Sequence, residues 1–564
     1  MNSAPHPWRK PSFILSLLLI SHCHGAFAAA PLDAGGQLKQ IPPAPALQKD
    51  APKIDILPSP APAPLDQPGE RIMVNSLKIS GAEFYTQEEL LLIAGFKPGS
   101  LMTLLDLRDM ATKVADHYHK NGYFVAQVYL PPQDIVDGNV TIAVMVGKYD
   151  NFTLRNESDL SDHLAKGILE GLNKADPILS APLENRLLLL SDIPGIFVKS
   201  SLVPGASVGT SDLIVDILPG KRITGSLDAD NAGNRLTGLY RLGSMTNINN
   251  PSGLGDVASL RTLTSGEGLK YARASYQIQM GKATAGIAYS GVKYALGKEL
   301  ESLGAEGSAR IASIFGRYPL VRSRQSSLYA QLAYDAKTFQ DKVASELTVS
   351  GKRARVLMAS LSGDHRDNFA GGGQAAFSVT LTSGDVDIKT FVMESFDAET
   401  ARSDGQFRKI GANFSRLQSV TDSLSLSVAI NGQFASKNLD ASEKMELGGM
   451  YGVRAYPEGE AYGDQGYVAN LEVRYLLPKF YPYLPGQMQL IGFVDAGSVM
   501  INKRPWVSGQ NKRTLGGAGF GLTWAEVNDY SLKTYYAHGI GNEAIVSDPK
   551  GASSRFWMQV LKHF

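Results

Sequence analysis

The last three-fifths of this chain alternate apolar and polar residues over many short segments and contain no long apolar run. Residues 424–434 and 468–475 alternate almost without error, and residues 272–280 place Arg, Ser and Gln against Ala, Tyr, Ile and Met. A period of two is that of a β-strand, whose side chains point alternately to the two faces of a sheet. In water such strands would suggest a large sandwich. In a membrane the apolar face meets lipid, the polar face lines a wet lumen, and the sheet must close so that every backbone group is paired.

The chain ends in a further alternating segment, residues 556–564, and its last residue is Phe564. A terminal aromatic after an alternating strand is typical of bacterial outer-membrane β-barrels, and we interpret Phe564 as a C-terminal insertion signal. Residues 222–564 number 343, and at about 9–11 residues a strand plus turns they allow about 14 to 18 antiparallel strands. No helical pattern follows residue 221. We therefore predict an outer-membrane antiparallel β-barrel of about 16 strands, whose aqueous lumen must be plugged or gated.

The N-terminus has the pattern of a secretory signal peptide over residues 1–28. Arg9 and Lys10 precede a short apolar core at 13–20, and Ala26-Phe27-Ala28 offers a cleavage site. The core is too short to span a bilayer as a helix, which needs about 20 residues. The one cysteine, Cys23, lies before the cleavage site and follows a histidine, which does not suit a lipoprotein. We predict a mature chain without a thiol.

Residues 29–70 contain a proline-rich stretch, with nine prolines in the 27 residues from Pro42 to Pro68. Such a stretch is a semi-rigid extended spacer. It is either a passive linker or a tether for an upstream element that moves. The upstream residues 29–41 contain three apolar side chains interrupted by Gly35-Gly36, so periodicity alone does not decide whether they form a helix.

Between the linker and the barrel, one supersecondary unit occurs twice in tandem, over residues 71–148 and 149–221. Each copy has the order β-α-α-β-β, and such an internal repeat is interpreted as one unit used twice. Thr86 with Glu89 gives a helix-start signature in the first copy. The first copy is predicted to have strands at 71–79, 123–130 and 139–146 and helices ending near 94 and spanning 105–121. The second is predicted to have strands at 149–155, 195–203 and 211–218 and helices at 159–170 and 181–190.

Motifs for catalysis are nearly absent. The run Gly516–Gly521 imitates a phosphate loop, but no helix pattern follows it, so we interpret these as strand glycines. His117 and His119 are two apart on a predicted helix and do not share a face. The formal net charge of +1 gives no reason to expect a nucleic-acid partner. We predict no enzymatic activity, no cofactor and no metal site.

Two barrel segments stand out on physical grounds. Residues 448–459 are rich in glycine and carry Arg454 between aromatics, as a loop that folds inward could. Residues 489–497 form a predicted strand in which Phe493 and Asp495 lie opposite an apolar face. If that apolar face meets lipid, Asp495 points into the lumen. Arg454 and Asp495 are then either partners or separate solvated charges.

The whole arrangement resembles the outer-membrane transporters of two-partner secretion (type Vb), the TpsB or ShlB/FhaC/HecB family of the POTRA plus β-barrel superfamily. The resemblance covers nearly the whole chain, including two POTRA-like modules and the terminal phenylalanine. Residues 228–238 are similar to the family's first barrel segment, residues 250–256 to its Asn-Pro-x-Gly-x-Gly-Asp turn, and residues 367–373 to a further recurrent patch.

The resemblance implies a transport or gating loop that folds back into the lumen and carries Val453, Arg454, Ala455 and Tyr456. It also implies a barrel-wall motif made of Phe493, Asp495 and Gly497, with the arginine held by the aspartate. An arginine fork matches a carboxylate in a bidentate geometry. Ala455 departs from the glycine of the family pattern, and if that position needs a positive φ, alanine would be strained there. The family also places a plug helix before the linker.

The resemblance further implies an exporter that recognises a large partner exoprotein in the periplasm through its POTRA-like modules and secretes it through the barrel. The implied partner is TpsA-like, of a haemolysin, adhesin or haem-binding type, and the sequence does not name it. A free edge strand of a module could accept an extended partner segment. Outer-membrane lipid and lipopolysaccharide would surround the barrel, and barrel-assembly machinery would insert it. The alternatives are a barrel-assembly factor and a passive porin or receptor, which fit the linker or the modules less well.

Overall fold

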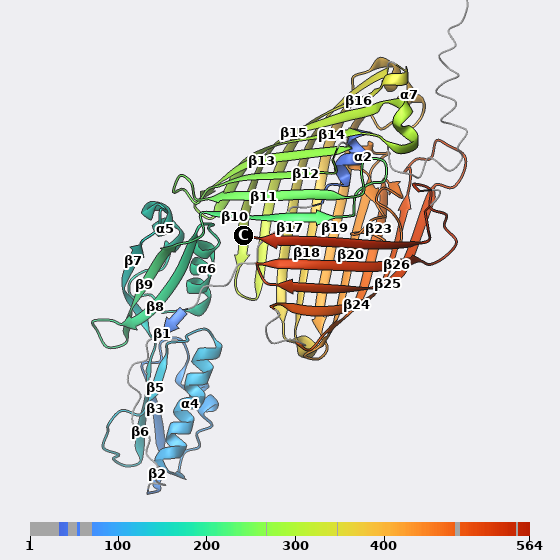
Figure 1. Ribbon diagram of the computed structural model, residues 1–564. Coiled ribbons are helices and arrows are strands. Elements are labelled where there is room, and N and C mark those ends of the chain that lie inside the picture. Colours follow the sequence, from blue (N-terminus) through green and yellow to red (C-terminus); the bar gives the residue numbers. More distant parts are fainter. Residues whose placement is uncertain are drawn as a thin grey trace, which may run out of the picture.

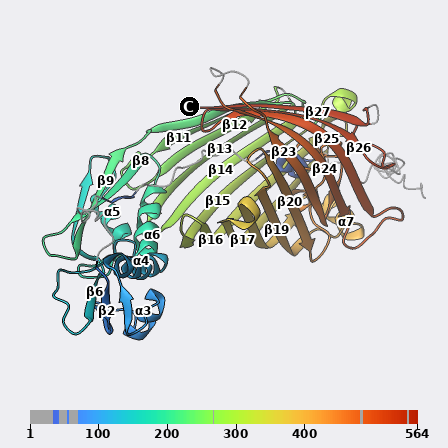
Figure 2. The ribbon, with the colours of Figure 1, turned by 90° about the horizontal axis from the view of Figure 1, so that it is seen from below.

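The computed structural model describes residues 33–42, 45, 54–56, 70–266, 268–346, 348–479, 485–548 and 551–564. The predicted signal peptide at 1–28 and most of the proline-rich stretch lie outside these residues. Figure 1 shows two small α/β modules in blue and teal beyond one end of a large barrel, and Figure 2 shows the same arrangement after a turn of 90°. Among the described residues, no helix is both long enough and apolar enough to cross a membrane.

The first module follows the predicted order, with two additional short strands. Its three-stranded sheet has the order β3-β6-β5, and two helices pack on it through a core that includes Leu107, Val114 and Tyr118. Both helices begin with a capping box, and hydrogen bonds from the Thr103 backbone and hydroxyl lower the pKa of Asp106. The elements are β2 Ile72–Val74, β3 Ser76–Ser80, α3 Gln87–Ala94, β4 Ser100–Met102, α4 Leu104–Lys120, β5 Gln127–Tyr129 and β6 Asn139–Met145.

The second module repeats this plan and gains a strand from the linker. The elements are β7 Lys148–Asn156, α5 Asp162–Leu169, α6 Ser180–Ser191, β8 Ile196–Pro204 and β9 Thr210–Pro219. The linker strand β1, Ile54–Ile56, pairs in parallel with β8 and gives a sheet of order β1-β8-β9-β7. The chain before the first module therefore occupies the β8 edge, whereas β7 forms the other edge of the sheet.

The two modules and the barrel are joined by direct contacts. Ser180 donates a backbone hydrogen bond of 2.9 Å to the Gly122 carbonyl oxygen, which links the two modules. Arg322, at the end of β15, donates two hydrogen bonds of 2.8 and 2.9 Å to the Asp192 carboxylate, which follows α6. Ser161 donates to the carbonyl oxygen of Gly253 in the predicted turn at 250–256. The second module is thus docked on the barrel turns at its own end of the barrel.

The barrel closes with sixteen antiparallel strands, as predicted. The first strand β10 pairs with the last strand β27, and this pairing seals the sheet. The strands are β10 Ile223–Asp230, β11 Arg241–Asn249, β12 Val257–Thr264, β13 Leu269–Met280, β14 Ala283–Ala295, β15 Ala305–Arg322, β16 Ser326–Val343, β17 Thr348–Asp367, β18 Gly373–Ile388, β19 Gly405–Ser419, β20 Leu424–Ala435, β23 Gln465–Leu476, β24 Gln487–Met500, β25 Lys512–Glu526, β26 Tyr530–Gly539 and β27 Ser554–His563.

Side chains that alternate between apolar and polar along a strand point alternately to the outside and to the lumen of the barrel. On β23, Leu471 and Val473 point outward and are about half exposed, at 50% and 45%. Glu472, between them, points inward and is bonded to other lumen side chains. The run Gly516–Gly521 lies within β25, so its prediction as strand glycines is confirmed. Phe564 exchanges two backbone hydrogen bonds with Gly225 of β10, so the C-terminus lies against the first strand.

One prediction about the barrel is wrong in detail. Residues 391–399 form the helix α7, Phe391–Glu399, in the loop between β18 and β19. The nine residues give too few turns for a helical period to be recognised beside long alternating segments. Short 3₁₀ helices also occur in this part of the chain, at Lys298–Leu303, Ala344–Glu346, Phe369–Gly371 and Ala441–Glu443. All of them lie in turns or loops between barrel strands.

Candidate functional site

The loop between β20 and β23, residues 436–464, folds into the barrel, and we call it the lumen loop. It contains a 3₁₀ turn η5, Ala441–Glu443, and a short ladder of β21, Met445–Glu446, with β22, Tyr462–Gly463. Most residues from 447 to 464 are buried, although the segment has almost no regular secondary structure. Loops normally run over a protein surface, because a buried loop must satisfy its own backbone groups. Partners supplied by the barrel wall therefore decide the position of this loop.

One of the buried wall contacts joins Arg454 to Asp495 of β24. The Nε and Nη2 atoms of Arg454 donate hydrogen bonds of 2.8 and 2.7 Å to the two carboxylate oxygens of Asp495. The Arg454 backbone N–H donates a third, of 3.0 Å, to the same carboxylate. Both side chains are buried, with residue exposures of 4% and 1%. This bidentate, charge-assisted geometry fixes the direction of the loop as well as its distance from the wall.

Aromatic rings complete the site around the guanidinium. The Cζ atom of Arg454 lies 3.5 Å from the centroid of the Phe493 ring and 5.0 Å from that of Tyr535. Phe493 and Tyr535 themselves meet edge to face, with their centroids 5.9 Å apart. A buried cation gains from such ring faces in addition to its carboxylate. Phe493 and Asp495, two residues apart on one strand, thus contact the same arginine, one through its ring and the other through its carboxylate.

Sequence reasoning missed four side chains of this site. Glu472 of β23 accepts a hydrogen bond of 2.7 Å from Nη1 of Arg454, and Asn470 donates one of 2.8 Å to Asp495. Arg474 pairs in turn with Glu472. The indole N–H of Trp557 on β27 donates a hydrogen bond of 2.7 Å to the Arg454 carbonyl oxygen. The alternation of β23 already placed its three polar residues on the lumen face, but it could not show which would meet Arg454. That depends on the register between strands.

Ala455 fits the loop without backbone strain. Ala455 does not adopt a positive φ, so the position needs no glycine for conformational reasons. Its methyl carbon faces Gly517 of β25, where an added Cβ would lie only 2.6 Å away. Gly497 has a similar role, because a Cβ there would lie 3.0 Å from Leu447 and 3.3 Å from Val453. Glycines on the wall therefore leave the space that loop side chains fill.

This complementarity gives a testable pair of substitutions. Gly517→Ala should displace the lumen loop, because two methyl carbons would compete for one space, and overpacking of this kind costs about 1–3 kcal/mol. We expect secretion of a partner to fall several-fold, measured as partner protein in the medium. The double variant Ala455→Gly/Gly517→Ala should recover, since one methyl again fills the space. Equal loss in the single and the double variant would contradict the packing explanation.

Tyr456 and Val453 shape the tip of the loop. The Tyr456 backbone N–H donates a hydrogen bond of 3.0 Å to the Val453 carbonyl oxygen, which closes a tight turn that contains Arg454. Val453 itself donates a backbone hydrogen bond of 2.7 Å to the Leu447 carbonyl oxygen. Both side chains are buried in a cluster with Leu515. The four predicted loop residues, Val453 to Tyr456, and the three wall residues, Phe493, Asp495 and Gly497, are all brought together.

A second element inside the barrel is the helix α2, Ala34–Lys39, which Figure 1 shows in blue among the strands. Asp33 caps the helix and also pairs with Lys352 of β17, with 2.8 Å between Oδ2 and Nζ. The Ala34 backbone N–H donates a hydrogen bond of 2.8 Å to the Asp341 carboxylate of β16. The guanidinium of Arg241 on β11 donates one of 2.9 Å to the Gln40 carbonyl oxygen. The helix is therefore held by polar contacts at both of its ends.

The helix and the lumen loop also contact each other. Lys352 bridges Asp33 to Asp440 of the loop, with 2.7 Å to the second carboxylate. The side-chain amide of Gln40 donates a hydrogen bond of 3.0 Å to the hydroxyl of Tyr462. A Cβ added at Gly35 would lie 2.8 Å from the Ser442 nitrogen, which explains a glycine inside this helix. The six-residue helix therefore forms although two of its residues have poor helix propensity.

Comparisons with known proteins decide the family. A family model described as haemolysin secretion/activation protein ShlB/FhaC/HecB matches residues 209–524, which is more than half of the chain. The chain belongs to this family. A model of the POTRA domain, ShlB-type, matches residues 72–147 of the first module. The predictions of family and of fold are therefore confirmed.

Curated relatives extend the match along most of the chain. The chain is 28% identical over 475 residues to the heme/hemopexin transporter protein HuxB of Haemophilus influenzae, covering 83% of this chain and 82% of the relative. It is 24% identical over 494 residues to the outer membrane transporter CdiB of Escherichia coli, covering 85% and 80%. The protein is an outer-membrane transporter, not an enzyme. It recognises a large partner exoprotein in the periplasm through its POTRA domains and secretes it through the barrel.

Solved structures share this fold at low sequence identity. CdiB from Escherichia coli superposes with a TM-score of 0.67 at 20% identity, covering 90% of this chain and 93% of that chain. BamA from Haemophilus ducreyi lacking POTRA domains 1–3 superposes with a TM-score of 0.52 at 16% identity, covering 87% and 100%. At such identities the likeness shows the fold alone. The barrel end beside the modules is the periplasmic end, and the opposite end is extracellular.

Proposed function

We propose that the Arg454–Asp495 contact holds the lumen loop in the position that secretion requires. The observation that carries this proposal is the bidentate pair itself, buried with its ring contacts and with Glu472. Removing one partner of a buried pair leaves a charge without compensation in a poorly solvated site. The loop would then lose its one charged anchor on β24 while the barrel strands keep their hydrogen bonds.

We further propose that α2 closes the lumen at rest. It contacts Lys352, Asp341 and Arg241, which lie on three different strands, β17, β16 and β11. The helix is therefore bound to the lumen wall at several points. The same helix is packed against Ser442 of the lumen loop. A partner that passes through the barrel cannot share this space with α2, so secretion would require that the helix leaves. The strand β1 on the second module belongs to the same chain segment.

The proposed partner is an exoprotein of a haem- or hemopexin-binding type. The support is the name of the relative HuxB, to which the chain is 28% identical, against 24% for CdiB. Relatives in this family serve different partners, so the likeness to HuxB favours one class without fixing the individual protein.

Co-expression tests the partner class. The transporter would be produced with a two-partner exoprotein of the hemopexin-binding type, and in parallel with one of the contact-dependent toxin type. We expect release of the first into the medium at least several-fold above the second, measured by immunoblotting of medium and cells. Preferential release of the toxin-type partner, or equal release of both partners, would overturn the assignment.

A further inference from the structure

A cluster of cations lies on the outer face of the barrel at its extracellular end. It consists of Lys293 on β14, Arg310 on β15, and Arg353 and Arg355 on β17, and we call it the basic cluster. The strand register places Arg310 opposite Thr338 and Thr338 opposite Arg353, in one row across three strands. Arg355 lies in the next row. All four side chains are exposed.

The cluster points outward, away from the lumen. Lys352, which precedes Arg353, points inward and binds Asp33 and Asp440. Alternation along β17 then directs Arg353 and Arg355 to the opposite face. Leu357 and Leu361 follow on that outward face, with exposures of 47% and 40%. The basic cluster therefore lies immediately above the apolar band that meets lipid.

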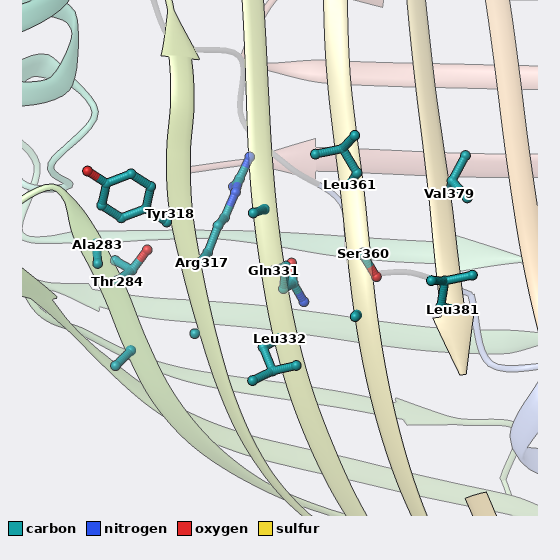
Figure 3. A pocket seen from close by; sticks show the side chains of 14 residues that line it. Ala283, Thr284, Arg317, Tyr318, Gln331, Leu332, Ser360, Leu361, Val379 and Leu381 are labelled. Carbon is teal, nitrogen blue, oxygen red and sulfur yellow. The ribbon is translucent and has the colours of Figure 1, made fainter. Parts of the chain in front are cut away.

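An apolar hollow of about 810 Å³ lies on the same wall, between the cluster and the periplasmic end, and reaches Ala283 at the start of β14. Small residues on neighbouring strands, such as Gly316 and Ala359, form part of its lining, and the register aligns Gly316, Leu332, Ala359 and Leu381 in one row. Figure 3 shows one large apolar or aromatic lining side chain from each of four neighbouring strands: Tyr318, Leu332, Leu361 and Leu381. From Arg355 to Ala359 is four residues along β17, or about 13 Å, and from Arg310 to Gly316 is six residues along β15, or about 20 Å.

The charges of the cluster are not balanced by ion pairs within the part of the chain that the structure describes. No ion pair is present there for Lys293, Arg310, Arg353 or Arg355. Two carboxylates face the cluster across the ladder, Asp385 opposite Arg355 and Asp387 opposite Arg353. Asp387 forms its ion pair with Lys389. The four cations of the cluster outnumber these two carboxylates, and anionic groups near a membrane surface are attracted to such patches.

We propose that the basic cluster and the hollow form one binding site for a phosphorylated, multiply acylated glycolipid of the outer leaflet, namely the lipid A part of lipopolysaccharide. Its phosphate groups contact the arginines, and one acyl chain fills the hollow below. The extracellular position selects the outer leaflet, because an inner-leaflet phospholipid would need its cations at the periplasmic end. A polypeptide is disfavoured, since the hollow lies in the apolar band of the wall.

Two kinds of variant test the two halves of the site in the full-length, detergent-solubilised transporter. The triple variant Arg310→Gln/Arg353→Gln/Arg355→Gln removes the phosphate contacts, and Gly316→Leu fills the hollow. An added Cβ at Gly316 has its nearest neighbour, the Thr284 carbonyl oxygen, at 3.8 Å, so the backbone has room for a side chain. Matched controls on the far wall are Lys512→Gln and Ala518→Leu of β25, which change an outward cation and an outward small residue.

The measurement is the binding of purified lipid A carrying its two inner sugars, and of phosphatidylglycerol, by native mass spectrometry and by the shift in melting temperature. We expect wild type to bind lipid A more tightly than phosphatidylglycerol. We expect at least tenfold weaker lipid A binding in the triple variant, since each interfacial cation contributes about 1 kcal/mol and three are lost. Gly316→Leu should weaken lipid A binding several-fold, and both β25 controls should match wild type.

Four outcomes would overturn the proposal. One is unchanged lipid A binding in the triple variant with an intact barrel, judged by its heat-modifiable migration. Another is equal binding of phosphatidylglycerol, which would make the patch a general anion site. The third is normal lipid A binding combined with impaired partner secretion in the triple variant, which would assign the cluster to the exported chain. Loss of binding in the β25 controls would likewise assign binding to the wall in general.

Discussion

Replacing Arg454 by alanine is expected to reduce partner release into the medium at least tenfold while the barrel remains inserted. The substitution leaves Asp495, 1% exposed, without its bidentate partner, and breaking a buried pair in this way costs about 3–5 kcal/mol. Asp495→Ala should have an effect of the same size, since it leaves the guanidinium with Glu472 alone. The measurement is an immunoblot of partner in medium and cells, with the membrane fraction tested for folded barrel.

A matched control uses another bidentate pair of the wall. Arg416 of β19 donates hydrogen bonds of 2.8 and 3.0 Å to Asp367, but this pair lies at the periplasmic end and does not contact the lumen loop. Arg416→Ala should therefore keep secretion within about twofold of wild type, as expected for a partly exposed pair. Normal secretion from both Arg454→Ala and Asp495→Ala would remove the pair from the mechanism. Equal loss in Arg416→Ala would point to general damage of the barrel.

The lumen-facing half of this site could be predicted because alternation is a local property. Once the apolar residues of β24 were assigned to lipid, Phe493 and Asp495 had to face inward, and their exposures of 5% and 1% agree. The partners Glu472 and Trp557 could not be predicted, because they come from other strands and meet Arg454 only through the register. Register depends on pairing across the sheet, which no single segment encodes.

The short helix α2 could not be predicted from local sequence. Propensity argues against a helix that contains Gly35 and Gly36, yet α2 forms inside the barrel. The close approach of Ser442 to Gly35 explains why a small residue is required there, and Asp33 supplies the cap. Tertiary contacts with residues more than 300 positions away thus determine a helix that its own sequence disfavours. The first helix of the first module, by contrast, was predictable because the cap made by Thr86 with Glu89 acts locally.

Lys352→Ala is expected to open the resting channel, with a several-fold increase in mean conductance in planar bilayers. The single lysine neutralises Asp33 of α2 and Asp440 of the lumen loop, at 2.8 and 2.7 Å, and is itself 9% exposed. Its loss leaves two carboxylates facing each other without a cation, and like charges at short range repel. The helix should then leave the lumen more often, and cells should become sensitive to bulky antibiotics that wild type excludes.

Lys342→Ala, which breaks an exposed pair with Glu306, should conduct as wild type does. Unchanged conductance in Lys352→Ala would show that the remaining contacts of α2, with Asp341 and Arg241, suffice to hold it.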